Sequence, residues 1–407
     1  MTCRHCGASD LQPVIDLGTS PPSNAYPPTG TDPDTEPRLP LRAAVCPRCW
    51  LMQTEDVIER DDLFTADYAY FSSYSTSWLE HAERYVDRMV RGLALSADDL
   101  VVEIASNDGY LLQYVQARGV QALGIEPTAD TAAVARERGI PTVERFFGEA
   151  LGRELAAAGS RPKLMVANNV LAHVPDINDF VAGFAELLAD DGLATFEFPH
   201  LLVLLRDGLY DTIYHEHFSY LSLGTVQRIF EANGLRAVDV EQIPTHGGSL
   251  RVHAVAAGNS REESPHVAAI IHQEQEAGLF AIAGYEHLQG LADRTRAWLR
   301  ELLEGEVQAG RTVMAYGAAA KGTTLLNHAG VDRTLLDGVV DRNPAKQGRQ
   351  MPGTGIPIHP EERLRETRPE TVLILPWNLS DEIAGQLEYV ESWGARFAVP
   401  LPQGRVW

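Results

Sequence analysis

The stretch "DDLVVEIASNDGYLL" at residues 98–112 decides the fold of this chain. Its apolar run, residues 100–104, predicts a buried parallel strand. Asn107, Asp108 and Gly109 then predict a tight turn, after which the chain has the pattern of a helix. A strand, a turn and a helix in this order form the repeating unit of doubly wound sheets. The sequence therefore predicts an α/β fold around a parallel sheet.

The same alternation continues along the chain. We expect further strands within residues 120–126, 162–176, 193–200 and 250–258, and helices at 77–93, 129–139 and 177–192. A long helical stretch at about residues 274–306 follows. Residues 311–330 then start a second strand–turn–helix unit, which residues 336–348 and 371–387 continue. The pattern indicates two α/β domains, each with its own crevice at the strand ends.

All four cysteines lie in the first 49 residues, as Cys3-x-x-Cys6 and Cys46-x-x-Cys49. Two such pairs bring together four thiolates, which is the ligand set of a tetrahedral zinc ion. Two disulfides or free thiols are the alternative, and a reducing compartment disfavours the disulfides. Because all four ligands are cysteine, we expect a closed, structural zinc site. The segment between the pairs is rich in proline over residues 19–37, which predicts irregular chain in place of helix or sheet.

The net charge of the chain limits the kinds of molecule that it is expected to bind. The 407 residues carry 34 Lys and Arg against 56 Asp and Glu, a net charge of −22. This acidic balance disfavours nucleic acid and anionic membranes as partners. The first residues form no apolar leader, and no apolar stretch reaches the ~20 residues of a membrane span. We therefore expect a cytoplasmic enzyme with a small-molecule substrate, and a monomer.

The first turn and the end of the second strand form a candidate cofactor site. Glu126 ends the second strand, where an acidic residue commonly binds the ribose hydroxyls of a nucleoside. A solvated carboxylate at a strand end is the alternative. The turn lacks the G-x-G-x-x-G glycines that let a backbone approach the pyrophosphate of NAD. Glu103, Asn107 and Asp108 suit a cationic methyl donor better, so the sequence favours S-adenosylmethionine over NAD.

A second stretch, "YHEHFSYLS" at residues 214–222, holds many proton-handling groups. Imidazole is the natural base near neutral pH, and either Glu216 or His217 could remove a proton from a substrate. In extended chain Tyr214 and Glu216 would lie on one side and His217 on the other, so we expect a loop that brings all three to one pocket. A polar turn with tyrosines in the core is the alternative.

The motifs follow one another in an order that resembles a known family. The four cysteines are followed by "EIASNDGYLL", "NNVLAHVPD", "YHEHFSYLS", "THGGSLRV", "AYGAAAKGTTLLN" and "LPWN", over essentially the whole chain. Together they resemble the three-part sugar C-methyltransferases that make deoxysugars for antibiotics and other natural products. One departure is Ala105, where the turn of that family more often has glycine.

The resemblance implies three parts and one reaction. The parts are a zinc-binding N-terminal lobe at residues 1–72, a central Rossmann-like class I methyltransferase domain at 73–270, and a C-terminal Rossmann-like α/β domain at 271–407 that contributes to nucleotide-sugar binding. The implied reaction is S-adenosylmethionine-dependent methylation of the carbon next to the keto group of a dTDP-linked 4-keto-deoxysugar. We expect methylation at C3, with C5 as the alternative. Such a carbon reacts once a base removes its proton and donors stabilise the enolate.

The candidate site residues fall into four groups. We expect His217 to be the base, Glu216 to be a reserve base or a charge that holds the site, Tyr214 to anchor the sugar, and Tyr68 and His173 to lie beside them. The candidate cofactor contacts are Glu103, Ala105, Asn107, Asp108, Gly109, Glu126, Asn168, Tyr70 and Phe71. The candidate contacts of a nucleotide-sugar substrate are Lys321, Gly317, Thr323, Thr324, His246, Ser249, Arg251, Trp377 and Asn378. The candidate zinc ligands are Cys3, Cys6, Cys46 and Cys49.

Two other functions are compatible with parts of the sequence. A NAD-dependent sugar-nucleotide oxidoreductase or epimerase would act on a similar substrate, but neither first turn contains G-x-G-x-x-G. A non-catalytic zinc-containing binding protein would leave the histidines and the glutamate of residues 214–222 unexplained.

Overall fold

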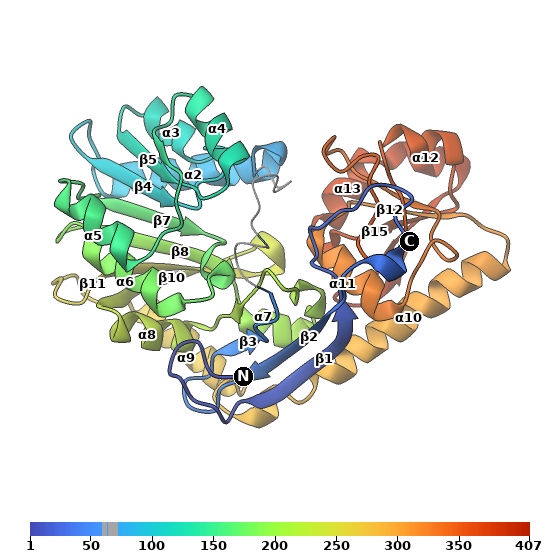
Figure 1. Ribbon diagram of the computed structural model, residues 1–407, viewed down its shortest axis with the longest axis horizontal. Coiled ribbons are helices and arrows are strands. Elements are labelled where there is room, and N and C mark those ends of the chain that lie inside the picture. Colours follow the sequence, from blue (N-terminus) through green and yellow to red (C-terminus); the bar gives the residue numbers. More distant parts are fainter. Residues whose placement is uncertain (59–62, 64–71) are drawn as a thin grey trace.

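A computed structural model describes residues 1–58, 63 and 72–407 of the chain. Figure 1 shows a central α/β domain, a C-terminal α/β domain and an N-terminal lobe whose strands run between them. The predicted site residues Tyr68, Tyr70 and Phe71 lie outside the described residues. Among the described helices, none combines the length and the apolar character that crossing a membrane requires.

The N-terminal lobe contains a four-stranded antiparallel sheet in the order β1-β2-β3-β9. β1 (Gln12–Ser20), β2 (Leu39–Val45) and β3 (Met52–Thr54) come from the lobe, whereas β9 (Ser219–Tyr220) comes from the middle of the chain. The predicted irregular chain is confirmed for most of residues 21–38, with a short 3-10 helix at Pro33–Thr35. The prediction was wrong for β1 and β2. Their Pro13, Gly18 and Pro40 are turn signals that hid both strands.

The central domain has a seven-stranded sheet in the order β10-β11-β8-β7-β4-β5-β6. Its strands are β4 (Leu100–Ile104), β5 (Gln121–Ile125), β6 (Thr142–Val143), β7 (Leu164–Asn168), β8 (Leu193–Pro199), β10 (Leu235–Ile243) and β11 (Ser249–Ala256). β4 to β8 run parallel, and β11 runs antiparallel to β8 and to β10. The chain leaves β4 first toward β5 and later toward β7, so the sheet reverses its order beside β4. Ligands bind at such a reversal, at the carboxyl ends of the strands.

Helices cover both faces of this sheet (Figure 1). They are α2 (Thr76–Gly92), α3 (Leu112–Ala117), α4 (Ala129–Glu137), α5 (Glu149–Ala157), α6 (Ile177–Leu187), α8 (Leu223–Ala232) and α9 (Pro265–Glu276), whereas α7 (Leu201–Asp207) packs with the C-terminal sheet. The strands and helices predicted for residues 77–258 are present, and β6, β9, β10, α5, α7 and α8 are additional. The predicted α/β fold is thus confirmed.

The C-terminal domain has a six-stranded sheet in the order β14-β13-β12-β15-β16-β17. Its strands are β12 (Val313–Tyr316), β13 (Gly338–Val340), β14 (Ile358–His359), β15 (Thr371–Ile374), β16 (Arg396–Val399) and β17 (Arg405–Val406), and its helices are α10 (Leu288–Gln308), α11 (Ala320–Ala329), α12 (Glu362–Thr367) and α13 (Ser380–Gln386). The long helix predicted at about 274–306 is instead α9 and α10 with a break between them. Gly278 has a φ of 80°, which ends α9.

The N-terminal lobe has no core of its own and shares those of both domains. Apolar side chains of β1 and β2 pack into one buried cluster with α7 and the C-terminal sheet. Cys3, Cys46, Cys49 and Leu51 pack into a second cluster with the central domain. The lobe therefore places each of its two ends against a different domain.

Candidate active site

The four cysteines come together as predicted. Their Sγ atoms all lie within 4.8 Å of one another, with 3.4 Å between Cys3 and Cys49 and 3.5 Å between Cys6 and Cys46. Each pair ends in the same tight turn, in which the N–H of the residue after the second cysteine donates to the carbonyl of the first at 2.9 Å. Tetrahedral zinc–thiolate bonds of ~2.3 Å place the sulfur atoms about 3.8 Å apart. The cluster therefore fits a structural zinc ion.

The predicted cofactor turn lies at the carboxyl end of β4. Ala105, Asn107 and Gly109 have φ values of 55°, 50° and 77°. A left-handed conformation costs an alanine roughly 1–2 kcal/mol, which explains why glycine suits the position of Ala105. A Cβ at Gly109 would lie 2.2 Å from Ile140 Cδ1, so any other residue there would also have to displace the end of that side chain. Asn107 N donates to Glu126 Oε2 at 2.9 Å, so the turn is closed onto the end of β5.

Several buried acceptors around this turn have no hydrogen-bond partner among the described residues. They include both carboxylate oxygens of Glu103, Oδ1 of Asp108 and Oδ1 of Asn168, at the ends of β4 and β7. Burial raises the pKa of Glu103 well above its usual value, and the nearby Tyr110 hydroxyl opposes this effect. Buried acceptors are normally paired, so these atoms call for donors from a ligand. The ammonium and ribose hydroxyls of S-adenosylmethionine are such donors, and the residues fit this cofactor.

The stretch at residues 214–222 forms the predicted irregular turn and then β9. His217 Nδ1 lies 2.8 Å from Thr212 O, and His173 Nδ1 lies 2.8 Å from Glu216 O. A carbonyl oxygen only accepts, so each Nδ1 carries the hydrogen and donates it. Nε2 of each neutral ring is therefore the unprotonated nitrogen. The Tyr214 hydroxyl lies 2.8 Å from His217 Nε2 and donates to it.

The two imidazoles lie close together in buried surroundings. Their ring centroids are 4.5 Å apart in an edge-on arrangement. Burial, reinforced by the neighbouring His173, lowers the pKa of His217 well below its usual value. Burial also lowers the pKa of His173 to about 4. Both rings are thus neutral near pH 7, and each offers a lone pair on Nε2.

Glu216 points to the N-terminal lobe. Its Oε1 accepts hydrogen bonds from the backbone N and the side-chain Nδ2 of Asn24, at 3.1 and 3.2 Å. The next histidine on this turn, His215, makes a contact of 3.1 Å with Pro40 O. The turn therefore places His217 and His173 together and directs Glu216 and His215 to other partners.

Three of the predicted substrate residues lie together at the ends of β12 and β15. Lys321 Nζ donates to Asn378 Oδ1 at 2.7 Å and lies 4.6 Å from the centre of the Trp377 ring. Trp377 Nε1 donates to Asp211 Oδ2 at 2.7 Å. Asp211 belongs to the 3-10 helix Tyr210–Thr212, directly before the stretch at residues 214–222. This contact joins the central and C-terminal domains.

Burial shifts the pKa values of both charged residues in this group. It raises the pKa of Asp211 to about 6 and lowers that of Lys321, while the attraction between the two opposes both shifts. Lys321 is also among the charges that lower the pKa of His217. The amine thus lies near enough to the imidazole to influence it electrostatically.

Other predicted substrate residues use their polar groups within the protein. Thr323 and Thr324 donate to Ser23 O at 3.1 Å and to Ile213 O at 2.9 Å. Ser249 Oγ donates to Thr245 O at 2.9 Å. These three hydroxyls join segments of the chain.

Arg251, Gly317 and His246 also have close neighbours within the protein. Arg251 is 3% exposed, and its Nη2 lies 2.8 Å from Glu197 Oε2 in the interior of the central domain. A Cβ at Gly317 would lie 2.4 Å from Pro376 Cγ, so this glycine permits a close approach of two strand ends. His246 has a φ of 54°, and its Nε2 lies 3.2 Å from Asn169 Nδ2.

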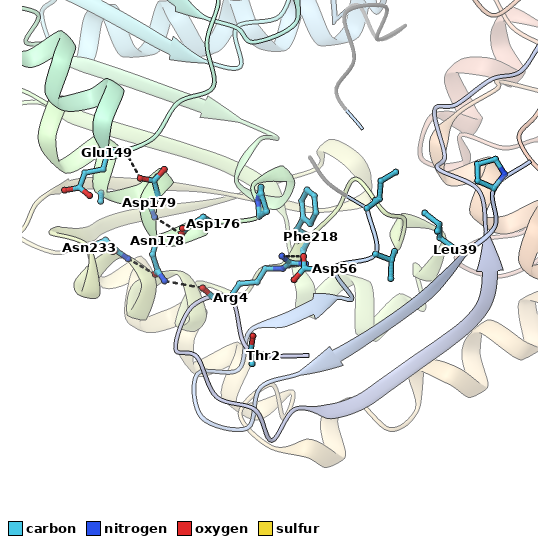
Figure 2. A pocket seen from close by; sticks show the side chains of 15 residues that line it. Thr2, Arg4, Leu39, Asp56, Glu149, Asp176, Asn178, Asp179, Phe218 and Asn233 are labelled. Carbon is cyan, nitrogen blue, oxygen red and sulfur yellow. Dashed lines mark hydrogen bonds and ion pairs between the residues drawn. The ribbon is translucent and has the colours of Figure 1, made fainter. Parts of the chain in front are cut away.

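A cavity of about 1200 Å³ lies between the N-terminal lobe and the central domain (Figure 2). Arg4, Asp56, Asn178 and Phe218 are among the residues that line it, and none of the predicted site residues within the described ranges does so. Figure 2 shows Arg4 extending between Phe218 and Asp56. A cavity of about 20 Å³ borders His217 itself, together with Ala172, Thr212 and Tyr220.

Sequence reasoning missed several residues of the site. Asn169 follows Asn168 in a motif already singled out, so its place at the end of β7 was a usable signal. Asp211, Glu197 and Asn24 had no such signal, because each acquires its partner only when distant segments meet.

Three family models match the chain in order. They describe a zinc binding domain at residues 3–64, a methyltransferase domain at 78–240 and a C-methyltransferase C-terminal domain at 244–402. The C-methyltransferase NovU of Streptomyces niveus is 38% identical over 405 residues, covering 99% of this chain and 96% of that protein.

Solved structures resemble parts of the chain. The magnesium protoporphyrin IX methyltransferase ChlM of Synechocystis PCC 6803, with bound SAH, is 16% identical with a TM-score of 0.34, over 44% of this chain and 83% of that one. The PH0226 protein of Pyrococcus horikoshii OT3 is 12% identical with a TM-score of 0.38, over 46% and 95%. No conclusion rests on these partial likenesses.

The near full-length match to NovU agrees with the motifs, the zinc cluster and the cofactor crevice. The resemblance noted from the sequence is confirmed, as are S-adenosylmethionine and structural zinc as cofactors. The chain belongs to the S-adenosylmethionine-dependent C-methyltransferase family.

Proposed function

We propose that the protein methylates the carbon next to the keto group of a dTDP-linked 4-keto-deoxysugar, at C3, in deoxysugar biosynthesis. The group of the buried His217 with the half-buried Tyr214 and His173 is the observation that carries this proposal. A carbon acid beside a ketone requires an unprotonated base and a donor for the oxygen that gains charge. His217 Nε2 and the Tyr214 hydroxyl supply both, 2.8 Å apart.

The hydrogen bonds of the site define the path of the proton. His217 Nδ1 donates to Thr212 O, so the proton taken from carbon arrives at Nε2. The Thr212 carbonyl then stabilises the charged ring. Tyr214 donates to Nε2 in the free protein and donates to the ketone oxygen once that oxygen replaces Nε2 as its partner. When bound, S-adenosylmethionine supplies an electrophilic methyl group on a positively charged sulfur.

We also propose that the nucleotide lies between the central and C-terminal domains, which we divide at residues 73–270 and 271–407, with the zinc-binding lobe at 1–72. Lys321 supports this placement, because a diphosphate in a protein of net charge −22 requires a local cation. The group of Lys321, Trp377 and Asp211 lies where these two domains meet.

Incubation with a panel of dTDP-linked ketosugars and methyl-labelled donor tests the reaction, with NMR of the product to locate the methyl group. We expect labelling at the carbon next to the ketone, at C3. Labelled product on oxygen or nitrogen, or the absence of labelled sugar throughout the panel, would refute the proposal.

The variant His217→Asn tests the base. We expect the rate of methyl transfer and the rate of solvent exchange of the proton next to the ketone both to fall by about 10²–10⁴-fold. His215→Asn is the matched control, because His215 belongs to the same turn but contacts Pro40 O. Exchange at the wild-type rate in His217→Asn excludes His217 as the base.

A further inference from the structure

Residues 21–30 carry the N-terminal lobe across onto the C-terminal domain (Figure 1). Tyr26 is 4% exposed, and its hydroxyl donates to Ala318 O at 2.7 Å. Thr323 Oγ1 donates to Ser23 O at 3.1 Å. Asn24 lies between these two attachment points. The C-terminal domain thus fixes the backbone on both sides of Asn24.

Asn24 in turn contacts the catalytic stretch. Its backbone N and its side-chain Nδ2 both donate to Oε1 of Glu216. Glu216 is 1% exposed, and its Oε2 has no hydrogen-bond partner among the described residues. Oε1 is therefore held by two donors, while Oε2 is a buried acceptor without a donor among the described residues.

The surroundings of Glu216 explain why these donors matter. Burial raises the pKa of Glu216, and the backbone N–H of Glu216 itself, the N–H groups of Asn24 and the backbone of Ser23 oppose this rise. The hydroxyl of Tyr220 interacts electrostatically with Glu216, and His173 contacts the Glu216 carbonyl. Neither is a cation at neutral pH, because a tyrosine carries no positive charge and burial lowers the pKa of His173 to about 4. Among the described side chains, that of Asn24 donates directly to the carboxylate.

We propose that Asn24 is a positioning residue of the methyl-transfer site, which holds the Glu216 carboxylate ionised and oriented beside His217. The role in methyl transfer rests on the proposed function. The contact between Asn24 and Glu216 does not, and it is open to a test without substrate.

The first experiment titrates Glu216 by NMR in protein labelled with carboxyl-¹³C glutamate. Its signal is identified by its loss in Glu216→Gln. We expect Asn24→Ala to raise the pH midpoint of the Glu216 titration by about one pH unit, because one charge-assisted hydrogen bond is lost. Asn24→Asp, of equal size but with a like charge, should raise it further. Equal midpoints in the wild type and both variants would overturn the proposal.

The second experiment measures methyl transfer to the accepted ketosugar. We expect Asn24→Ala to lower kcat about tenfold, to move the acid limb of the pH profile upward, and to leave the KM for S-adenosylmethionine unchanged. In the double variant with Glu216→Gln, Asn24→Ala should cause no further loss. Additive losses would contradict a role through Glu216.

Thr29→Ala is the matched control. Thr29 lies on the same segment, and its Oγ1 donates to Arg349 O at 2.9 Å without contacting Glu216. We expect an unchanged midpoint and an unchanged kcat. A shift in Thr29→Ala equal to that in Asn24→Ala would assign the effect to the segment as a whole and overturn the specific role of Asn24. If no ketosugar is methylated by the wild type, the proposed function fails, whereas the NMR titration still decides the role of Asn24.

Discussion

At the scale of single residues, backbone carbonyls decide how the histidines of the site work. Thr212 O and Glu216 O each hold an imidazole by its Nδ1. Both rings therefore have the tautomer in which Nε2 is the unprotonated nitrogen, and that of His217 accepts from the Tyr214 hydroxyl. Burial lowers the pKa of both histidines and so keeps their rings neutral. An exposed histidine with its ordinary pKa would be partly protonated.

This arrangement predicts the pH dependence of methyl transfer. A base acts only when unprotonated, and burial with the neighbouring His173 lowers the pKa of His217 well below 6.5. We expect kcat/KM to stay constant as the pH falls to 6.5 and to decline only below that value. His173→Gln removes a group that lowers this pKa, so the acid limb should move to higher pH. His266→Gln, on the exposed start of α9, is the control. An acid limb above pH 6.5 in the wild type would contradict this assignment.

At the scale of elements, the catalytic stretch is the edge of the lobe's sheet. β9 pairs with β3 through Met52–Tyr220 and Gln53–Ser219. Arg4, between the first two cysteines, donates from Nε to Phe218 O at 3.3 Å and from Nη2 to Thr54 O at 3.1 Å. Its guanidinium also lies 4.9 Å from the centre of the Phe218 ring. The zinc turn thus holds the backbone directly after His217.

Replacement of this arginine tests the link between the zinc turn and the site. Arg4→Ala leaves two buried carbonyls with fewer donors, so we expect the free energy of unfolding to fall by about 1–3 kcal/mol. Hydrogen exchange of residues 214–222, followed by mass spectrometry, should become faster. Arg48→Ala is the matched control, because Arg48 lies between the two cysteines of the second pair but its side chain is 66% exposed. Equal exchange in both variants would show that Arg4 does not hold β9.

At the scale of the whole molecule, the N-terminal lobe joins the two α/β domains. Its cysteine turns pack on the central domain, where Thr225 and Arg228 of α8 both donate to Cys49 O at 3.2 Å. Its strands and residues 21–30 pack on the C-terminal domain. Because the lobe lacks a core of its own, the zinc ion stabilises the end that meets the central domain.

Metal removal therefore has consequences across the molecule. We expect one zinc per chain by metal analysis, and loss of that zinc with a lower melting temperature in Cys46→Ser, since structural zinc sites supply ~10–16 kcal/mol of apparent binding energy. Methyl transfer should fall as well, because β9 belongs to the same sheet as β3. His5→Gln is the control: His5 lies between Cys3 and Cys6 but contacts Asn178 at 2.8 Å. A metal-free protein with full activity and an unchanged melting temperature would refute this role of zinc.

The sequence by itself determined the features that depend on neighbouring residues. The spacing of two cysteine pairs brings four sulfur atoms together, and the apolar run before Asn107 forms β4 with its turn. Local periodicity and local turn chemistry suffice for these, so the fold class and the zinc site were predictable. The irregular turn at residues 214–218 was predictable, but it places His217 beside Tyr214 and His173 and directs Glu216 to Asn24.

Tertiary structure alone decided which polar groups meet. Arg251, Thr323 and Thr324 were reasonable substrate ligands by type, but their partners are Glu197, Ser23 O and Ile213 O. Asn24 and Glu216 are 192 positions apart, and Asp211 and Trp377 are 166 apart. A buried polar group must pair with whatever the folded chain places beside it. That neighbour depends on the packing of three sheets, which no local pattern in the sequence specifies.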